Sequence, residues 1–99
     1  MIIKGNLYLD ESSIESLGNI KEIKGNLILW KCYNLKDLGN LEIIRGDLIN
    51  LMFTKKLQSL GKLKSFDGKR ILLYASNITP KYIEEEKPFL LDKCIFRIA

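Results

Sequence analysis

Seven glycines recur along this chain with a period of about 21 residues. They fall into two sets: Gly5, Gly25, Gly46 and Gly68, and Gly18, Gly39 and Gly61. Within each set, neighbouring glycines are 20 to 22 residues apart. A fixed period of this length predicts one small structural unit that is repeated and stacked, because a unit so short cannot cover its own core.

Apolar residues repeat with the same period. Each glycine of the first set is followed by two apolar residues separated by one position: Leu7 and Leu9, Leu27 and Leu29, Ile49 and Leu51, Ile71 and Leu73. Three positions beyond each pair stands a small polar or thiol residue: Ser12, Cys32, Thr54 and Ser76. An alternating apolar pair predicts a short strand whose two apolar side chains point inward.

The combined pattern resembles the leucine-rich repeat, whose strand segment reads L-x-L-x-x-N/C-x-L within units of about 20–29 residues. The spacer Leu17-Gly18-Asn19-Ile20 and its copy Leu38-Gly39-Asn40-Leu41 are similar to the short repeats of bacterial and phage proteins. The resemblance implies an α/β solenoid with one curved parallel sheet of about five short strands and a mostly irregular convex side. The chain departs from the family pattern by placing Ser, Thr or Cys at the position where asparagine is common.

We expect a single domain over residues 1–99, with repeat units at about 5–24, 25–45, 46–67 and 68–87 and a C-terminal cap with the last strand over 88–99. Strands are expected near 7–9, 27–29, 49–51, 71–73 and 89–91, in that spatial order. The fifth strand follows from Phe89-x-Leu91-x-x-Cys94-x-Phe96. Thr79 and Pro80 read as the N-cap and first residue of a short helix over about 81–86.

Cys32 and Cys94 both occupy the Ser/Thr/Cys position in this alignment, so we expect two buried, reduced thiols. They would lie three strands apart, or about 14 Å at the usual strand spacing. A disulfide needs Cα atoms within about 7 Å, which excludes an intrachain bridge in such a fold.

The sequence lacks the side chains of several common catalytic sites. It contains no histidine, which excludes Ser-His-Asp and Cys-His arrangements. Two cysteines without histidine cannot form a structural zinc site, and no P-loop or dinucleotide-binding motif is present. We therefore expect no enzymatic activity, no cofactor and no metal.

Targeting signals are equally sparse. No apolar h-region follows Met1, and no apolar run approaches the roughly 18 residues of a membrane span. These features predict no membrane association and a cytoplasmic location, in a bacterium or in a phage-infected host cell.

The residues between the inward pairs are expected to face outward on the concave side, and many of them are large and apolar. The predicted partner-binding residues are Tyr8, Asp10, Ile28, Trp30, Asn50, Met52, Leu72 and Tyr74. Leu90 and Asp92 would continue the two rows on the fifth strand. Large exposed apolar patches mark interaction sites, so we expect a protein partner. By analogy with phage proteins, the chain would be an inhibitor of a host defence enzyme. Self-association is the structural alternative.

A run of basic residues supports a further alternative. The net charge of the chain is +4, and Asp67 is the one acid within a basic flank made of Lys55, Lys56, Lys62, Lys64, Lys69 and Arg70. Charge runs are usually solvated surface. Nucleic-acid binding through this flank is the less favoured reading, because aromatic residues do not alternate with the lysines as base-stacking platforms would.

Overall fold

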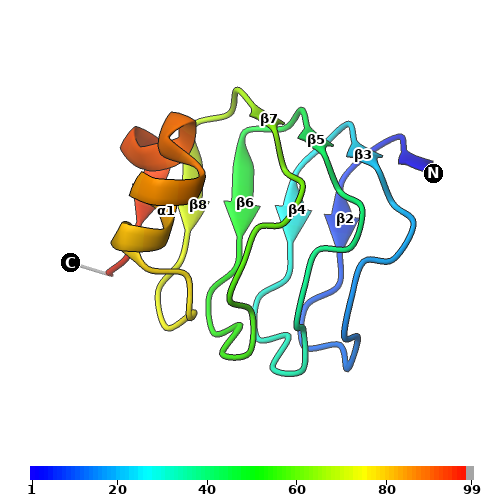
Figure 1. Ribbon diagram of the computed structural model, residues 1–99. Coiled ribbons are helices and arrows are strands. Elements are labelled where there is room, and N and C mark those ends of the chain that lie inside the picture. Colours follow the sequence, from blue (N-terminus) through cyan, green and yellow to red (C-terminus); the bar gives the residue numbers. More distant parts are fainter. Residues whose placement is uncertain (98–99) are drawn as a thin grey trace.

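The computed structural model describes residues 1–97, which form two parallel β-sheets and a helical C-terminal segment (Figure 1). The four-stranded sheet has the order β1 (Ile2–Ile3), β3 (Glu22–Ile23), β5 (Ile43–Ile44) and β7 (Ser65–Phe66). The five-stranded sheet has the order β2 (Leu7–Tyr8), β4 (Leu27–Ile28), β6 (Leu48–Asn50), β8 (Arg70–Leu72) and β9 (Cys94–Ile95). Along the chain, helix α1 (Pro80–Glu86) and the 3₁₀ helix η1 (Pro88–Lys93) connect β8 to β9.

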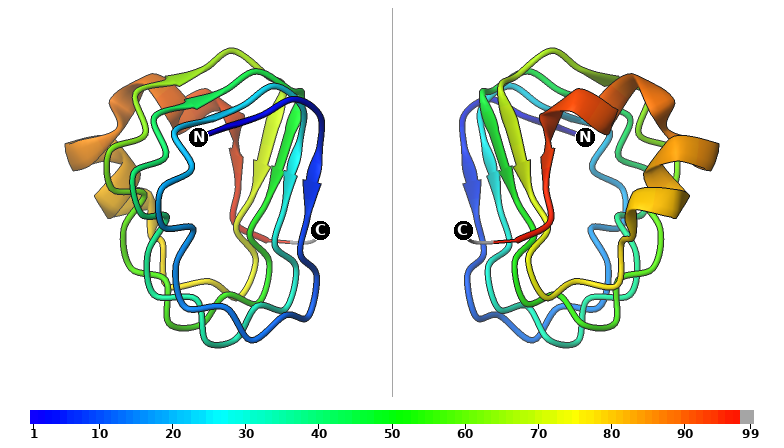
Figure 2. Two further views of the ribbon diagram at one scale, coloured as in Figure 1. Left: turned by 90° about the vertical axis from the view of Figure 1, so that its right-hand side faces the viewer. Right: turned by 90° about the vertical axis from the view of Figure 1, so that its left-hand side faces the viewer.

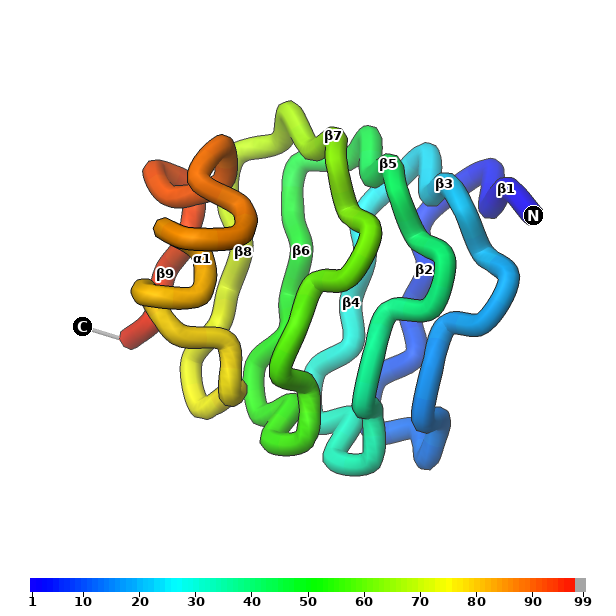
Figure 3. The backbone as a smooth tube through the Cα atoms, viewed as in Figure 1, coloured from blue at the N-terminus to red at the C-terminus, as the bar shows by residue number. Residues whose placement is uncertain are grey.

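The chain passes alternately through the two sheets, so that each coil adds one strand to each of them. Viewed along the stack, successive coils superpose around a shared interior (Figure 2), and the backbone trace follows them from the N-terminal end to the helical end (Figure 3). The register is constant: Leu27 pairs with both Leu7 and Ile49, and Ile49 pairs with Ile71. The 21-residue period of the sequence is thus one coil of the backbone.

The interior is filled by the periodic apolar residues. Leu27, Leu29, Ile49, Leu51 and Ile71 are fully buried, as the alternating pattern predicts. The spacer leucines and the residues three positions after them close the opposite wall: Leu38, Leu41, Ile44, Leu60, Leu63 and Phe66. Each such side chain stabilises the fold by about 1.5–3 kcal/mol when removed from water.

The glycines serve two purposes. Gly18, Gly39 and Gly61 have φ values of +57°, +60° and +54°, a region that other L-residues enter at a cost. Gly25 and Gly46 lie at the corner between the two sheets, where a Cβ on Gly25 would overlap the backbone of Gly5 and Asn6. The spacer glycines therefore provide turns, whereas Gly25, Gly46 and also Gly39 permit close stacking of coils.

A second left-handed position recurs after each strand of the five-stranded sheet. Glu11, Lys31, Phe53 and Ala75 have φ values between +58° and +62°. This turn directs the next residue inward, where Thr54 Oγ1 donates to the carbonyl of Leu51 at 2.6 Å. In the equivalent place, Cys32 Sγ donates to the carbonyl of Leu9 at 2.9 Å. Threonine and cysteine at this position thus satisfy carbonyls near the strand ends.

The C-terminal end of the stack is closed by α1 and η1. Thr79 Oγ1 accepts the Tyr82 N–H at 3.1 Å and caps α1, with Pro80 at the first helical position, in agreement with the sequence prediction. Ile83 and Leu90 are fully buried against the last coil. Tyr82 Oη accepts the N–H of Leu60 at 2.8 Å, which joins the helix to the preceding coil.

Two expectations are wrong. The strands form two parallel sheets and not a single one, because the residues three positions after each spacer, such as Ile23 and Ile44, pair in register across coils on the side expected to be irregular. The fifth strand is Cys94–Ile95 and not 89–91, because Pro88 begins a 3₁₀ helix that directs Leu90 inward.

This shift also moves Cys94. It pairs with Ile71 at an inward strand position and is half-buried, so the expectation that Cys94 is buried at the position equivalent to Cys32 is also wrong. Both thiols are free in the structure.

Candidate protein-binding surface

The outward side chains of the five-stranded sheet lie in two rows across neighbouring strands. The first row follows from the strand register, which pairs Tyr8 with Ile28, Ile28 with Asn50, and Asn50 with Leu72. The second row stands two positions further along each coil and contains Asp10, Trp30, Met52 and Tyr74. The structure therefore brings all eight predicted residues onto one face.

The register correction changes the last member of each row. Ile95 pairs with Leu72 and is 37% exposed, so it takes the place expected for Leu90, which is buried on the other side. Asp92 lies in η1, and Arg97 now stands two positions beyond Ile95.

The exposure of this face is uneven. Tyr8 is 61% exposed and Tyr74 is 37% exposed, whereas Trp30, Met52 and Leu72 are half-buried. Each of these half-buried side chains keeps part of its surface open to solvent. This is the arrangement of a packed apolar surface, and not of isolated side chains extending into water.

Specific contacts order the second row. Lys31 Nζ lies 4.3 Å from the centre of the Trp30 ring, within the range of a cation–π interaction. The rings of Phe53 and Tyr74 meet edge to face with centroids 5.5 Å apart. We call the set Tyr8, Ile28, Trp30, Met52, Phe53, Leu72, Tyr74 and Ile95 the aromatic face.

Sequence reasoning missed two members of this face, Phe53 and Ile95, and the bordering Lys31. Lys31 and Phe53 come directly after the outward row. Both have a left-handed backbone conformation, which their residue types do not predict. Ile95 was missed because two segments fit the apolar alternation of a strand equally well. The sequence prediction placed the strand at Phe89-x-Leu91, whereas the structure places it at the start of Cys94-x-Phe96. A signal for the second choice was Pro88, which favours a helical start over a strand.

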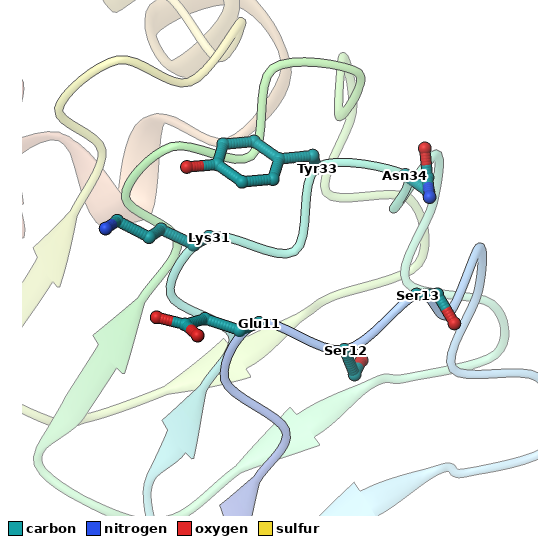
Figure 4. Close-up of a pocket in the computed structure, with 6 residues that line it drawn as sticks. All are labelled: Glu11, Ser12, Ser13, Lys31, Tyr33 and Asn34. Atoms are coloured by element: carbon teal, nitrogen blue, oxygen red, sulfur yellow. The ribbon is translucent and has the colours of Figure 1, made fainter.

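An open polar hollow of about 420 Å³ lies beside the aromatic face, lined by Glu11, Ser12, Ser13, Lys31, Tyr33 and Asn34 (Figure 4). The Glu11 carboxylate, the Lys31 ammonium group and the Tyr33 hydroxyl extend toward the same side, whereas Ser13 and Asn34 lie on the other side. Tyr33 is 48% exposed. Lys31 thus borders both the hollow and Trp30.

The six residues of the basic flank do not gather in one patch. Lys55 and Lys56 follow the C-terminal end of β6, whereas Lys69 and Arg70 stand at the N-terminal end of β8. Because these strands are parallel neighbours, the two pairs lie at opposite ends of the sheet.

Three of the five lysine side chains of the basic flank contact the preceding coil. Lys62 Nζ donates to Asn40 Oδ1 at 2.9 Å, and Lys64 forms a 2.9 Å ion pair with Glu42. Lys56 Nζ lies 3.4 Å from Asn34 Oδ1.

Among residues 1–97, two groups have displaced pKa values. Hydrogen bonding and charge attraction from Lys64 hold the pKa of Glu42 below its usual range. Burial raises the pKa of the Cys94 thiol to about 11, with a further contribution from the Asp92 carboxylate. Neither group lies among the eight predicted residues.

Comparison with family models, with curated proteins and with solved structures yields no match. Within residues 1–97, no cluster of three metal-ligating side chains occurs. In the same part of the chain, no helix has the length and hydropathy required to cross a bilayer.

Proposed function

We propose that the chain is a short leucine-rich-repeat solenoid that binds a protein partner through the aromatic face, without catalysis and in the cytoplasm. The repeat assignment is supported by the L-x-L pairs, which lie inward on neighbouring strands, and by the Cys32 and Thr54 side chains, which bond to backbone carbonyls where the family commonly has asparagine. The constant strand register from coil to coil agrees with it.

One observation carries the functional proposal. The core is already complete, since Leu27, Leu29, Ile49 and Leu51 are fully buried without help from the outward row. Packing therefore does not require large apolar residues such as Trp30 on the outer side of the same strands. Aromatic side chains and methionine are enriched in protein interfaces, where a few of them contribute most of the binding energy.

The geometry of the face suits a protein better than a small molecule. It extends across the five strands of one sheet, whereas sites for small ligands are compact and concave and bury most of the ligand. The polar groups at its border, Asp10 and Lys31, would form the solvated rim that such interfaces carry.

The nucleic-acid alternative receives less support. A phosphate-tracking site requires basic side chains along one path, and the basic flank is divided between two ends of the sheet. Inhibition of a host defence enzyme stays a prediction that rests on the resemblance to phage repeats.

The test begins by capturing partners from a host lysate with the wild-type chain and continues with the purified partner. Trp30→Ala should weaken binding by about 2 kcal/mol, or roughly thirtyfold in Kd, as expected for a central aromatic anchor. Tyr33→Ala is the matched control, because Tyr33 is an exposed aromatic residue outside the aromatic face. Thermal unfolding of both variants checks that the fold is kept.

The result that refutes the proposal is equally clear. If Trp30→Ala and Met52→Ala leave the Kd unchanged while Lys55→Glu and Lys56→Glu abolish binding, the basic flank is the binding surface and the aromatic face is not.

A further inference from the structure

The two ends of the stack differ in how completely they are covered. At the C-terminal end, α1 and η1 close the interior with Ile83 and Leu90 (Figure 1). At the N-terminal end, none of the described residues lies beyond the first coil. The inward residues of the first coil are therefore only partly buried: Ile3, Leu7, Leu9, Ile14 and Ile20. Their equivalents in the second coil are fully buried: Ile23, Leu27, Leu29, Leu35 and Leu41.

The N-terminal end also has a free strand edge. Leu7 N–H donates to Asn26 and Leu9 N–H donates to Ile28, so both amides point toward β4. Because backbone groups alternate along a strand, the N–H and C=O of Tyr8 point to the opposite edge, where the described residues supply no strand. An edge of this kind beside exposed apolar residues is a template for pairing with another strand.

Charge along this edge is arranged with opposite signs at its two ends. Lys4 stands before β2 and Lys24 stands at the same corner of the second coil, whereas Asp10 and Glu11 follow β2. All four side chains are exposed. If a second β2 lay antiparallel to the first, the basic end of each would meet the acidic end of the other. If it lay parallel, like charges would meet.

We propose that two copies of this chain associate through their N-terminal ends, with β2 of one copy antiparallel to β2 of the other. A two-fold axis at Leu7 would join the five-stranded sheets into one and place the partly buried first coils against each other. The same patch would serve on both copies, as in an isologous dimer. Lys4 of each copy would face Asp10 of the other, so each dimer would contain this charge pair twice.

This inference goes beyond the proposed function, because it uses the end of the stack and not the partner on the aromatic face. The first measurement is sedimentation velocity of the 99-residue chain over a concentration series. We expect a concentration-dependent dimer. A chain that stays monomeric at every concentration overturns the proposal, and so does assembly that continues beyond dimer.

Charge reversal tests the orientation. Lys4→Glu and Asp10→Lys should each weaken the dimer by at least about tenfold, because each creates two like-charge contacts across the two-fold axis. A mixture of the two single variants should form a mixed dimer, since each copy then faces an opposite charge. The double variant K4E/D10K should recover the dimer for the same reason.

Lys81→Glu, on α1 at the covered end, is the matched control and should leave the dimer unchanged. If K4E and D10K do not weaken the dimer, or if their mixture fails to form a mixed dimer, the antiparallel N-terminal interface is wrong. If a different protein occupies this end instead, the purified chain stays monomeric, which also overturns the proposal.

Discussion

Three spacer glycines provide a matched test of coil stacking. Gly18, Gly39 and Gly61 have nearly the same φ, but their surroundings differ. A Cβ on Gly18 would meet nothing within 4 Å, and one on Gly61 would lie 3.9 Å from the nearest atom. A Cβ on Gly39 would lie 2.5 Å from the carbonyl oxygen of Gly18 and 2.6 Å from its nitrogen.

The expected costs follow from these distances. Alanine at a left-handed position costs about 1–2 kcal/mol, of which about 0.4–1 kcal/mol is offset by the reduced freedom of the unfolded chain. Gly18→Ala and Gly61→Ala should therefore destabilise the fold by about 1 kcal/mol each. Gly39→Ala adds overpacking against backbone, which costs about 1–3 kcal/mol more. The same carbonyl of Gly18 accepts the N–H of Asn40, so relief of the overlap would disturb this bond.

The assay is urea unfolding at 25 °C, followed by circular dichroism, for the wild type and the three alanine variants. Gly39→Ala should lose about 2–4 kcal/mol in total, and its midpoint should lie well below the other two, which should be similar. Equal destabilisation of all three variants would refute the close approach of the first two spacers.

Three further predictions concern individual groups. Tyr82→Phe removes the hydroxyl that accepts a backbone N–H of the third coil. It should cost about 1–3 kcal/mol of unfolding free energy by urea titration, and an unchanged midpoint would argue against docking of α1 there. In a Cys32→Ser background, native Cys94 should react with a thiol reagent at pH 8 about a hundredfold more slowly than an unfolded cysteine, because its pKa of about 11 lowers the thiolate fraction; equal rates would contradict this. Glu42 has a lowered pKa, so its ion pair stabilises the fold above the unfolded pKa and is lost as pH falls through the folded value. Lys64→Ala should raise the Glu42 pKa toward normal in an NMR titration, and no change would exclude the pairing.

Much of the architecture could be predicted from the period alone. Pairs such as Leu27 and Leu29 predict which side chains point inward, and the constant spacing predicts which coils are neighbours. The N-cap at Thr79 was predictable because the Thr-Pro sequence carries its own local geometry. The second sheet was missed because two-residue strands such as Glu22–Ile23 are too short to show alternation.

The position of the last strand could not be predicted from the sequence pattern, for a physical reason. Phe89-x-Leu91 and Cys94-x-Phe96 both satisfy an apolar alternation, and the choice depends on whether Pro88 starts a helix that seals the stack. The packing of Leu90 into the core decides whether this helix forms, and the spacing of residues along the chain does not reveal that packing. The outward rows were predictable because they follow from the inward ones, whereas the contacts of Lys31 and Phe53 depend on the left-handed turn.

The influence of neighbouring coils on burial can be measured directly with two equivalent leucines. Leu7 and Leu27 occupy the same strand position, but Leu27 is fully buried between two coils and Leu7 is covered on one side only. Leu27→Ala should cost about 2–5 kcal/mol, as is typical of a buried leucine, and Leu7→Ala should cost about half as much at concentrations where the chain is monomeric. If the N-terminal ends associate, Leu7 becomes buried in the dimer, and the cost of Leu7→Ala should increase with protein concentration while that of Leu27→Ala stays constant. Equal costs at low concentration would mean that the first coil is already covered in the monomer, and the argument from its exposed end would fail.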